Sequence, residues 1–171
     1  MSTFGKFTKI FFFVSFAVTS FPSISTFEVI DICTARLDVY DNTTQAYVKS
    51  FCFVSDALQW QDALNFCQSK NMRLLRILNG VVQTAVLNQA IQVFGVIGSK
   101  LWVNAMRNSA GQWITFVNGT QLVMREAVRL LWLDQASQIA GNCLMITNPS
   151  GAYRFSGFSC NETLPFVCAY D

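Results

Sequence analysis

The chain has 171 residues and a formal net charge of +2, and it contains six cysteines but no histidine. Without histidine there is no imidazole general base and no Cys/His zinc site, which excludes most hydrolases and zinc fingers. The two lysines of the N-terminal leader account for the net charge, because ten basic and ten acidic residues remain outside it. Charge therefore predicts no nucleic-acid partner. A binding module is favoured over an enzyme, and we expect no catalytic residues.

Residues 1–25 have the three-part layout of a secretory signal peptide. Two lysines precede an apolar run at 10–18, and small residues with a proline follow it. This run is shorter than the roughly 20 apolar residues that cross a membrane. We therefore expect cleavage after Ser25 or Ser20, no stable membrane insertion of the mature chain, and one secreted, extracellular domain at 26–171.

Three N-x-S/T sequons, at Asn42, Asn118 and Asn161, predict N-glycosylation and agree with passage through the secretory route. Each lies in a polar, turn-like stretch. The pair formed by Asn118 and Gly119 is also typical of the tip of a β-hairpin.

An even number of cysteines behind a secretory leader predicts a domain stapled by disulfides. Six cysteines permit fifteen pairings, and the sequence alone selects none of them. If all six are paired, no free thiol remains as a nucleophile, which further disfavours an enzyme.

Two helices are predicted in the first half of the chain. Asp56 is a suitable N-cap, as is the preceding serine, and Gln59 stands where a capping-box partner belongs. The apolar residues that follow recur with helical spacing, and they are Trp60, Ala63, Leu64 and Cys67. A second helix is predicted over residues 81–94, with Gly95 ending it. We assign both apolar stripes to the core.

After Gly98 the pattern changes to short β-like runs bounded by turn residues, and these are residues 101–105, 113–117, 144–147, 153–158 and 166–170. A long connection at 120–142 separates the second run from the third, with some helix possible within 123–131. Connections of this length are often functional. This one carries an apolar patch at 130–133 made of Leu130, Leu131, Trp132 and Leu133.

Charge is unevenly distributed within the domain. No acidic residue lies between Asp62 and Glu126, whereas six basic residues do, namely Lys70, Arg73, Arg76, Lys100, Arg107 and Arg125. The favoured interpretation is a solvated basic face. The alternative is a site for anionic glycans or lipid head groups.

Several of these segments, in this order, resemble the C-type lectin-like domain. They are Trp60, Ala63 and Cys67; the run CQSKNMRLL at 67–75; Leu101-Trp102-Val103; Asn142-Cys143-Leu144; Cys160; and Phe166-Val167-Cys168. The resemblance covers residues 33–170. It implies an α+β fold in which two helices pack on short antiparallel sheets with a long loop region.

The resemblance also implies three disulfides. Cys67 would pair with Cys168 and tie the first helix to the last strand, and Cys143 would pair with Cys160. Cys33 would pair with Cys52 and close an N-terminal hairpin, as in long-form members of the family. The first closes about a hundred residues and would contribute about 4 to 5 kcal/mol on loop-entropy grounds.

Sugar binding in this family rests mainly on a calcium ion, and this chain departs from all three of the motifs that hold it. The family's Glu-Pro-Asn or Gln-Pro-Asp triplet is replaced by Gln135-Ala136-Ser137, its Glu before the third-from-last cysteine by Gly141, and its Trp-Asn-Asp by Phe155-Ser156-Gly157. Only Asp134 supplies a carboxylate nearby. Because calcium needs several carboxylates among six to eight oxygen ligands, we expect no calcium, no other metal and no cofactor. Phe155 is expected in the core.

The partner is expected to be a glycan or an extracellular protein. In the first hypothesis, amide side chains and an aromatic platform bind a glycan without calcium. The candidate residues are Gln135, Ser137, Trp132, Asn142 and Ser156. For Gln135, Ser137 and Ser156 the alternative is a solvated loop without a ligand. In the second hypothesis, the apolar patch at 130–133 binds a protein and no sugar is bound.

Overall fold

The computed structural model describes residues 32–40, 47–76, 80–95, 100–124, 132–149 and 152–170. The expected signal peptide, Asn42, Leu130 and Leu131 lie outside these residues. Among the helices described, none is long and apolar enough to cross a membrane.

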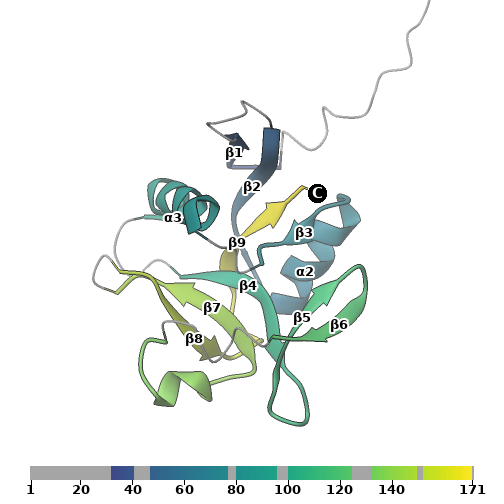
Figure 1. Cartoon of the computed structure of the whole chain (residues 1–171), viewed down its shortest axis with the longest axis vertical. Helices are drawn as coiled ribbons and strands as arrows, with labels where there is room; N and C mark the ends of the chain where they lie inside the picture. Colours follow the sequence, from purple (N-terminus) through teal and green to yellow (C-terminus); the bar gives the residue numbers. More distant parts are fainter. Residues whose placement is uncertain are drawn as a thin grey trace, which may run out of the picture.

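Two helices, one short 3-10 helix and nine strands make up the described domain (Figure 1). In chain order they are β1 (Ala35–Tyr40), β2 (Tyr47–Leu58), α2 (Trp60–Ser69), β3 (Arg73–Leu74), α3 (Gly80–Phe94), β4 (Lys100–Arg107), β5 (Trp113–Val117), β6 (Thr120–Val123), η2 (Ala136–Gln138), β7 (Cys143–Thr147), β8 (Arg154–Phe158) and β9 (Leu164–Ala169).

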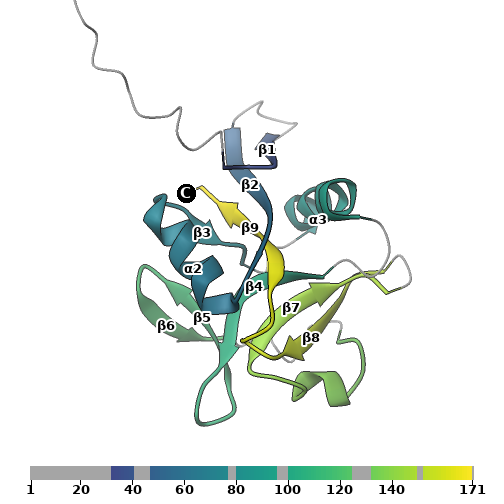
Figure 2. The same ribbon diagram turned by 180° about the vertical axis from the view of Figure 1, so that it is seen from behind.

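The strands follow the order β1-β2-β9-β4-β5-β6, with β3 paired to β9 and the β7–β8 hairpin paired to β4. Neighbours are antiparallel except β4 and β9, which meet in parallel where Trp102 pairs with Phe166. The N-terminal hairpin therefore lies beside the last strand, with Cys52 of β2 opposite Cys168 of β9. The helices flank this part of the sheet, and the β7–β8 hairpin and the β5–β6 hairpin lie beyond it (Figures 1 and 2).

The first helix is confirmed, but its predicted cap is wrong. Asp56 belongs to β2, whose pairing with β9 shifts register between Val54 and Leu58 and resumes at Leu58, and the helix begins only at Trp60. Gln59 occupies the N-cap without a side-chain hydrogen bond. The Trp60 amide instead donates to the carbonyl of Cys160 at 3.2 Å. Pairing with a strand distant in sequence therefore overrides the local capping signal.

The second helix and the five predicted strands are confirmed within a few residues. Gly95 ends α3 with φ of +104°, and its amide donates to the Ile91 carbonyl. Asn118 and Gly119 form the tip of the β5–β6 hairpin with φ of +51° and +76°, as their pairing in sequence predicted. The short strands β3 and β6 were not predicted.

The core is built from large side chains contributed by helices and strands together. Trp60 of α2 and Trp102 of β4 are fully buried, and each indole nitrogen donates at 2.8 Å to a backbone carbonyl, those of Val103 and Leu58 respectively. Both hydrogen bonds connect residues more than forty positions apart, so they lock the helix and strands in one arrangement.

All three expected disulfides are present. They join Cys33 to Cys52, Cys67 to Cys168 and Cys143 to Cys160, with sequence separations of 19, 101 and 17 residues. No cysteine remains free. The α+β, disulfide-stapled fold class is therefore confirmed.

Candidate recognition surfaces

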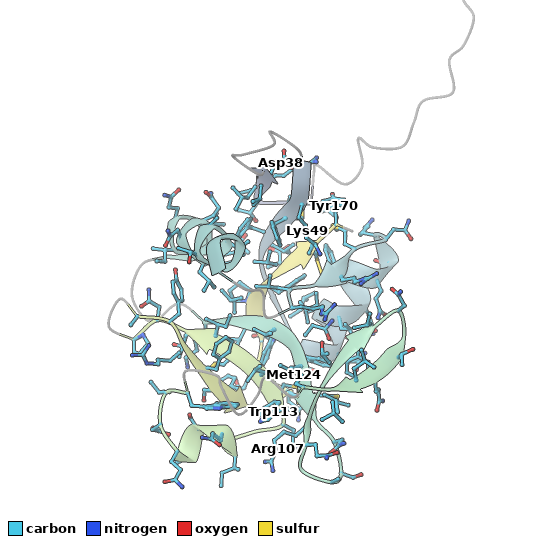
Figure 3. All side chains as sticks on the ribbon, viewed as in Figure 1. Asp38, Lys49, Arg107, Trp113, Met124 and Tyr170 are labelled. Carbon is cyan, nitrogen blue, oxygen red and sulfur yellow. A yellow bond between two sulfur atoms is a disulfide. The ribbon has the colours of Figure 1, made fainter. Side chains whose placement is uncertain are left out.

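The connection between β6 and β7 is attached to β8 at its described start. Trp132 forms a parallel bridge with Phe155, and the Leu133 amide donates to the Phe155 carbonyl at 2.9 Å. The indole of Trp132 packs on Trp113 of β5 with ring centroids 5.6 Å apart, and Figure 3 labels Trp113 at the lower end of the sheet. Trp132 is therefore half-buried, and only part of its ring is available to a ligand.

A small hydrogen-bonded turn then shapes the connection. The Ser137 amide donates to the Asp134 carboxylate at 2.6 Å, and the Ser137 hydroxyl donates to the Asp134 carbonyl at 2.6 Å. Ser137 is only 5% exposed. Its hydroxyl and the neighbouring carboxylate are thus used to fold the chain and to begin η2.

Two glycines bring the connection into direct backbone contact with β8. A Cβ atom on Gly141 would overlap the backbone carbonyl of Phe158. A Cβ atom on Gly157 would lie 2.7 Å from the carbonyl oxygen of Gly141 and 3.1 Å from that of Ser137. Neither position has room for any side chain, so close approach of backbones depends on glycine at both.

The family resemblance places these glycines at the positions of the acids in two of the calcium motifs. Asp134, the one carboxylate next to the third motif, accepts a hydrogen bond from the Ser137 amide. Within the residues that the structure describes, no three His, Cys, Asp or Glu side chains are grouped so as to hold a metal ion. The donor set and the available space at 134–157 therefore do not fit a calcium ion, which needs several carboxylates.

The five residues predicted to contact a ligand separate into two groups. Ser137 and Ser156 are buried, and the Ser156 hydroxyl donates to the Gly157 carbonyl at 2.9 Å. Gln135 and Asn142 are exposed, and Trp132 is half-buried. Phe155 is 4% exposed, which confirms its place in the core. Only three of the five candidates remain accessible to a ligand.

Two exposed apolar side chains accompany these three candidates. Leu133 is 43% exposed and Ile139 is 68% exposed. We call the accessible set the loop surface: Trp132, Leu133, Gln135, Ile139 and Asn142. It mixes carboxamides with apolar groups, and the exposed Asp134, which accepts a hydrogen bond from the Ser137 amide, lies next to it.

A second surface, which the sequence indicated only through the alternative of an anionic-ligand site in its acid-free stretch, lies between α2 and the β5–β6 hairpin. It is a cavity of about 450 Å³, here called the α2 cavity, and its lining residues are Leu64, Gln68, Asn71, Met72, Arg73, Asn104, Phe116, Asn118 and Gly119. Among the described residues that line it, Arg73 is the one with a charged side chain. The acid-free stretch from 63 to 125 was the one sequence signal for it, because all nine residues fall within that stretch.

Fold and sequence together define a lectin-type recognition domain. The family model of the lectin C-type domain matches residues 56–170, so the chain belongs to this family. The predicted resemblance is thereby confirmed. Members are generally recognition modules without enzymatic activity that bind glycans or proteins.

Individual relatives are distant in sequence. Rat lithostathine is 22% identical over 143 residues, which span 82% of this chain and 83% of the relative. The structure of human lithostathine aligns with a TM-score of 0.57 at 23% identity, covering 74% of this chain and 95% of that one. The C-type lectin domain of murine dendritic cell inhibitory receptor 2, in complex with N-glycan, aligns with a TM-score of 0.53 at 12% identity, covering 71% and 91%. These structural likenesses establish the fold.

Proposed function

We propose that this protein is a secreted recognition module that binds carbohydrate through the loop surface without a calcium ion. The packing of Gly141 and Gly157 against neighbouring backbone carries the proposal. The resemblance implies that sugar binding in the family rests mainly on a calcium ion, and this chain departs from the three motifs that hold it. Here the loop is shaped by its own backbone contacts and by the Asp134–Ser137 hydrogen bonds.

The chemistry of the loop surface suits a neutral saccharide. The side chains of Gln135 and Asn142 each offer an acceptor oxygen and a donor nitrogen, which match the dual character of sugar hydroxyls. The edge of Trp132 and the exposed Leu133 and Ile139 provide apolar contact for the C–H faces of a sugar ring. Both kinds of group occur together on this surface.

Secretion is supported by the cysteine pairing. Three disulfides and no free thiol are typical of proteins that fold in an oxidising compartment. Asn118 and Asn161 are both exposed, so their sequons are accessible for glycosylation. These observations agree with the secretory leader expected at 1–25.

The test is glycan-array binding of the secreted, oxidised protein with millimolar calcium and again with chelator. We expect the same glycans to bind in both conditions. Gln135→Ala should weaken that binding by about threefold to tenfold, the value of one or two hydrogen bonds. Gln92→Ala, an exposed glutamine on α3, is the matched control and should leave binding unchanged. Binding that chelator abolishes would contradict the proposal.

A protein ligand is the second candidate, and the exposure of Leu133 and Ile139 is the observation that favours it. In that case the array would be blank, and Leu133→Asp would abolish self-association or partner capture. Leu122→Asp, an equally exposed leucine on β6, provides the control. The rest of the predicted patch, Leu130 and Leu131, lies outside the described residues.

A further inference from the structure

We propose that the α2 cavity is a second binding site and that it takes an anionic saccharide, one bearing a carboxylate or a sulfate. The cavity lies beside α2 and the β5–β6 hairpin, whereas the loop surface lies beside η2 and β8. These elements stand on opposite sides of the molecule in both views (Figures 1 and 2). The inference is independent of the function proposed for the loop surface, and each can fail without the other.

One wall of the cavity is the end of α2 and the turn that follows it. Asn71 adopts φ of +56°, its amide donates to the Gln68 carbonyl at 3.0 Å, and the Met72 amide donates to the Cys67 carbonyl at 2.8 Å. This tight turn places Gln68, Asn71 and Arg73 around the same space. The Cys67–Cys168 disulfide and the pairing of Arg73 with Ala169 fix the wall to β9.

The opposite wall is the β5–β6 hairpin, and a buried amide fixes it to β4. Asn104 is 2% exposed; its side-chain nitrogen donates to the Phe116 carbonyl at 2.9 Å, and its oxygen accepts from the Phe116 amide at 3.1 Å. Both the donor nitrogen and the acceptor oxygen of the Asn104 carboxamide therefore hold the β5–β6 hairpin. Because both walls are fixed by backbone-directed bonds, a ligand would meet a preformed site at little ordering cost.

The lining matches an anionic sugar in three respects. Gln68, Asn71 and Asn118 offer carboxamides to hydroxyl groups, and Arg73 brings a positive charge that can bind a carboxylate or sulfate by charge-assisted hydrogen bonding. Phe116 is half-buried and supplies an apolar contact for a ring face, and the buried Leu64 and Met72 lie at the base of the cavity. Among the described residues no acidic side chain lines the cavity, and about 450 Å³ lies within the range of small-ligand pockets.

The sequon at Asn118 affects how the site must be tested. A glycan on this residue would begin at the edge of the cavity and compete with a bound ligand. Thr120→Ala removes the sequon and leaves both residues of the hairpin tip, Asn118 and Gly119, in place. We therefore assign the ligand contacts to Gln68, Asn71 and Arg73, and we measure binding in the unaltered protein and in Thr120→Ala side by side.

The experiment measures affinity of the secreted, oxidised protein for sialylated, sulfated and neutral forms of one oligosaccharide by calorimetry. We expect the protein with Thr120→Ala to bind the sialylated or the sulfated form more tightly than the neutral form. Arg73→Gln should weaken that binding about tenfold or more, the effect of charge-assisted hydrogen bonding. Arg76→Gln removes the same charge from an exposed position outside the lining, and it should change binding less than about threefold.

Gln68→Ala is the second variant, and it tests the site if Arg73→Gln fails to fold. Gln68 is exposed on α2, so we expect its replacement to leave folding intact. It should weaken binding about threefold to tenfold. If Arg73→Gln and Arg76→Gln weaken binding equally, the general positive charge of the protein explains the affinity, and the assignment of the ligand to the α2 cavity is overturned. Binding of acetate or sulfate alone as tight as that of the sugar would overturn the saccharide assignment, and no binding of either anionic form would overturn the site. The preference for the anionic form over the neutral form should persist in Gln135→Ala, because Gln135 lies on the loop surface and not in the α2 cavity.

Discussion

The two ends of the sheet are held together by opposite means. Around the Cys67–Cys168 disulfide, packing uses the largest side chains in the protein, and Trp60, Trp102 and Phe166 are fully buried there. Where the long connection meets the end of β8, Gly141 and Gly157 bring backbones into direct contact, in addition to the packing of Trp132 on Trp113. The first end is stabilised by removal of apolar area from water. The second depends on close approach that only glycine permits.

This difference bears on how each end can recognise a ligand. The side-chain-packed end leaves the α2 cavity between elements that are fixed separately, by a disulfide on one wall and by Asn104 on the other. The backbone-packed end leaves no space between connection and strand, so its ligands must bind to its outer side chains.

The largest expected effect comes from removing the disulfide of the side-chain-packed end. Replacing both Cys67 and Cys168 with serine should lower the free energy of unfolding by about 4 to 5 kcal/mol, because the disulfide closes a loop of 101 residues. Serine at both Cys143 and Cys160, whose separation is 17, should cost about 3 kcal/mol. Denaturant unfolding and secreted yield measure both. Equal losses would show that native packing around each bridge, and not loop length, sets its contribution.

A smaller but more local effect is expected at the backbone-packed end. Gly141→Ala should cost about 1 to 3 kcal/mol, because the added methyl group overlaps the Phe158 backbone and the connection must move away. Hydrogen exchange should increase over 132–142 and stay unchanged in α2. Asn142→Ala is the control, since its exposed side chain should contribute less than about 0.5 kcal/mol. Unaltered stability of Gly141→Ala would mean that the connection is loosely packed, and would weaken the argument against a calcium ion.

Much of the fold was predictable from the sequence because its signals are local. Helical spacing located α2 and α3, and β-like runs between turn residues located five strands. The disulfide pairing followed from the family resemblance and not from the residues themselves. The predicted start of α2 was wrong because β2 pairs with β9 again at Leu58 after a register shift, and that pairing joins segments more than a hundred residues apart.

The candidate sites were less predictable, and the reason is physical. Ser137 and Ser156 looked like surface hydroxyls, but their burial depends on Gly141 and Gly157 lying in backbone contact. A sequence shows that a glycine is present without showing which backbone approaches it. The α2 cavity was missed because its walls come from α2, β3, β4 and the β5–β6 hairpin, and only the three-dimensional arrangement brings them together.

The smallest expected effect concerns the contact between the start of β8 and α3. Tyr153, just before β8, donates its hydroxyl to the Leu87 carbonyl of α3, and burial raises the pKa of Tyr153 from 10.0 to about 12. In the unfolded chain the phenol ionises near pH 10, whereas in the folded chain it stays neutral until about pH 12. This contribution to stability is therefore complete below pH 10 and is lost as pH rises through about 12.

Tyr153→Phe should lower stability below pH 10 by about 1 kcal/mol, the value of one hydrogen bond. It should also flatten the decline between pH 10 and 12, because phenylalanine does not ionise in either state. Denaturant unfolding of both proteins across that interval measures the difference between the two curves. Parallel curves would show that Tyr153 ionises alike in both states. The hydroxyl would then be solvated, and packing of β8 against α3 would not depend on it.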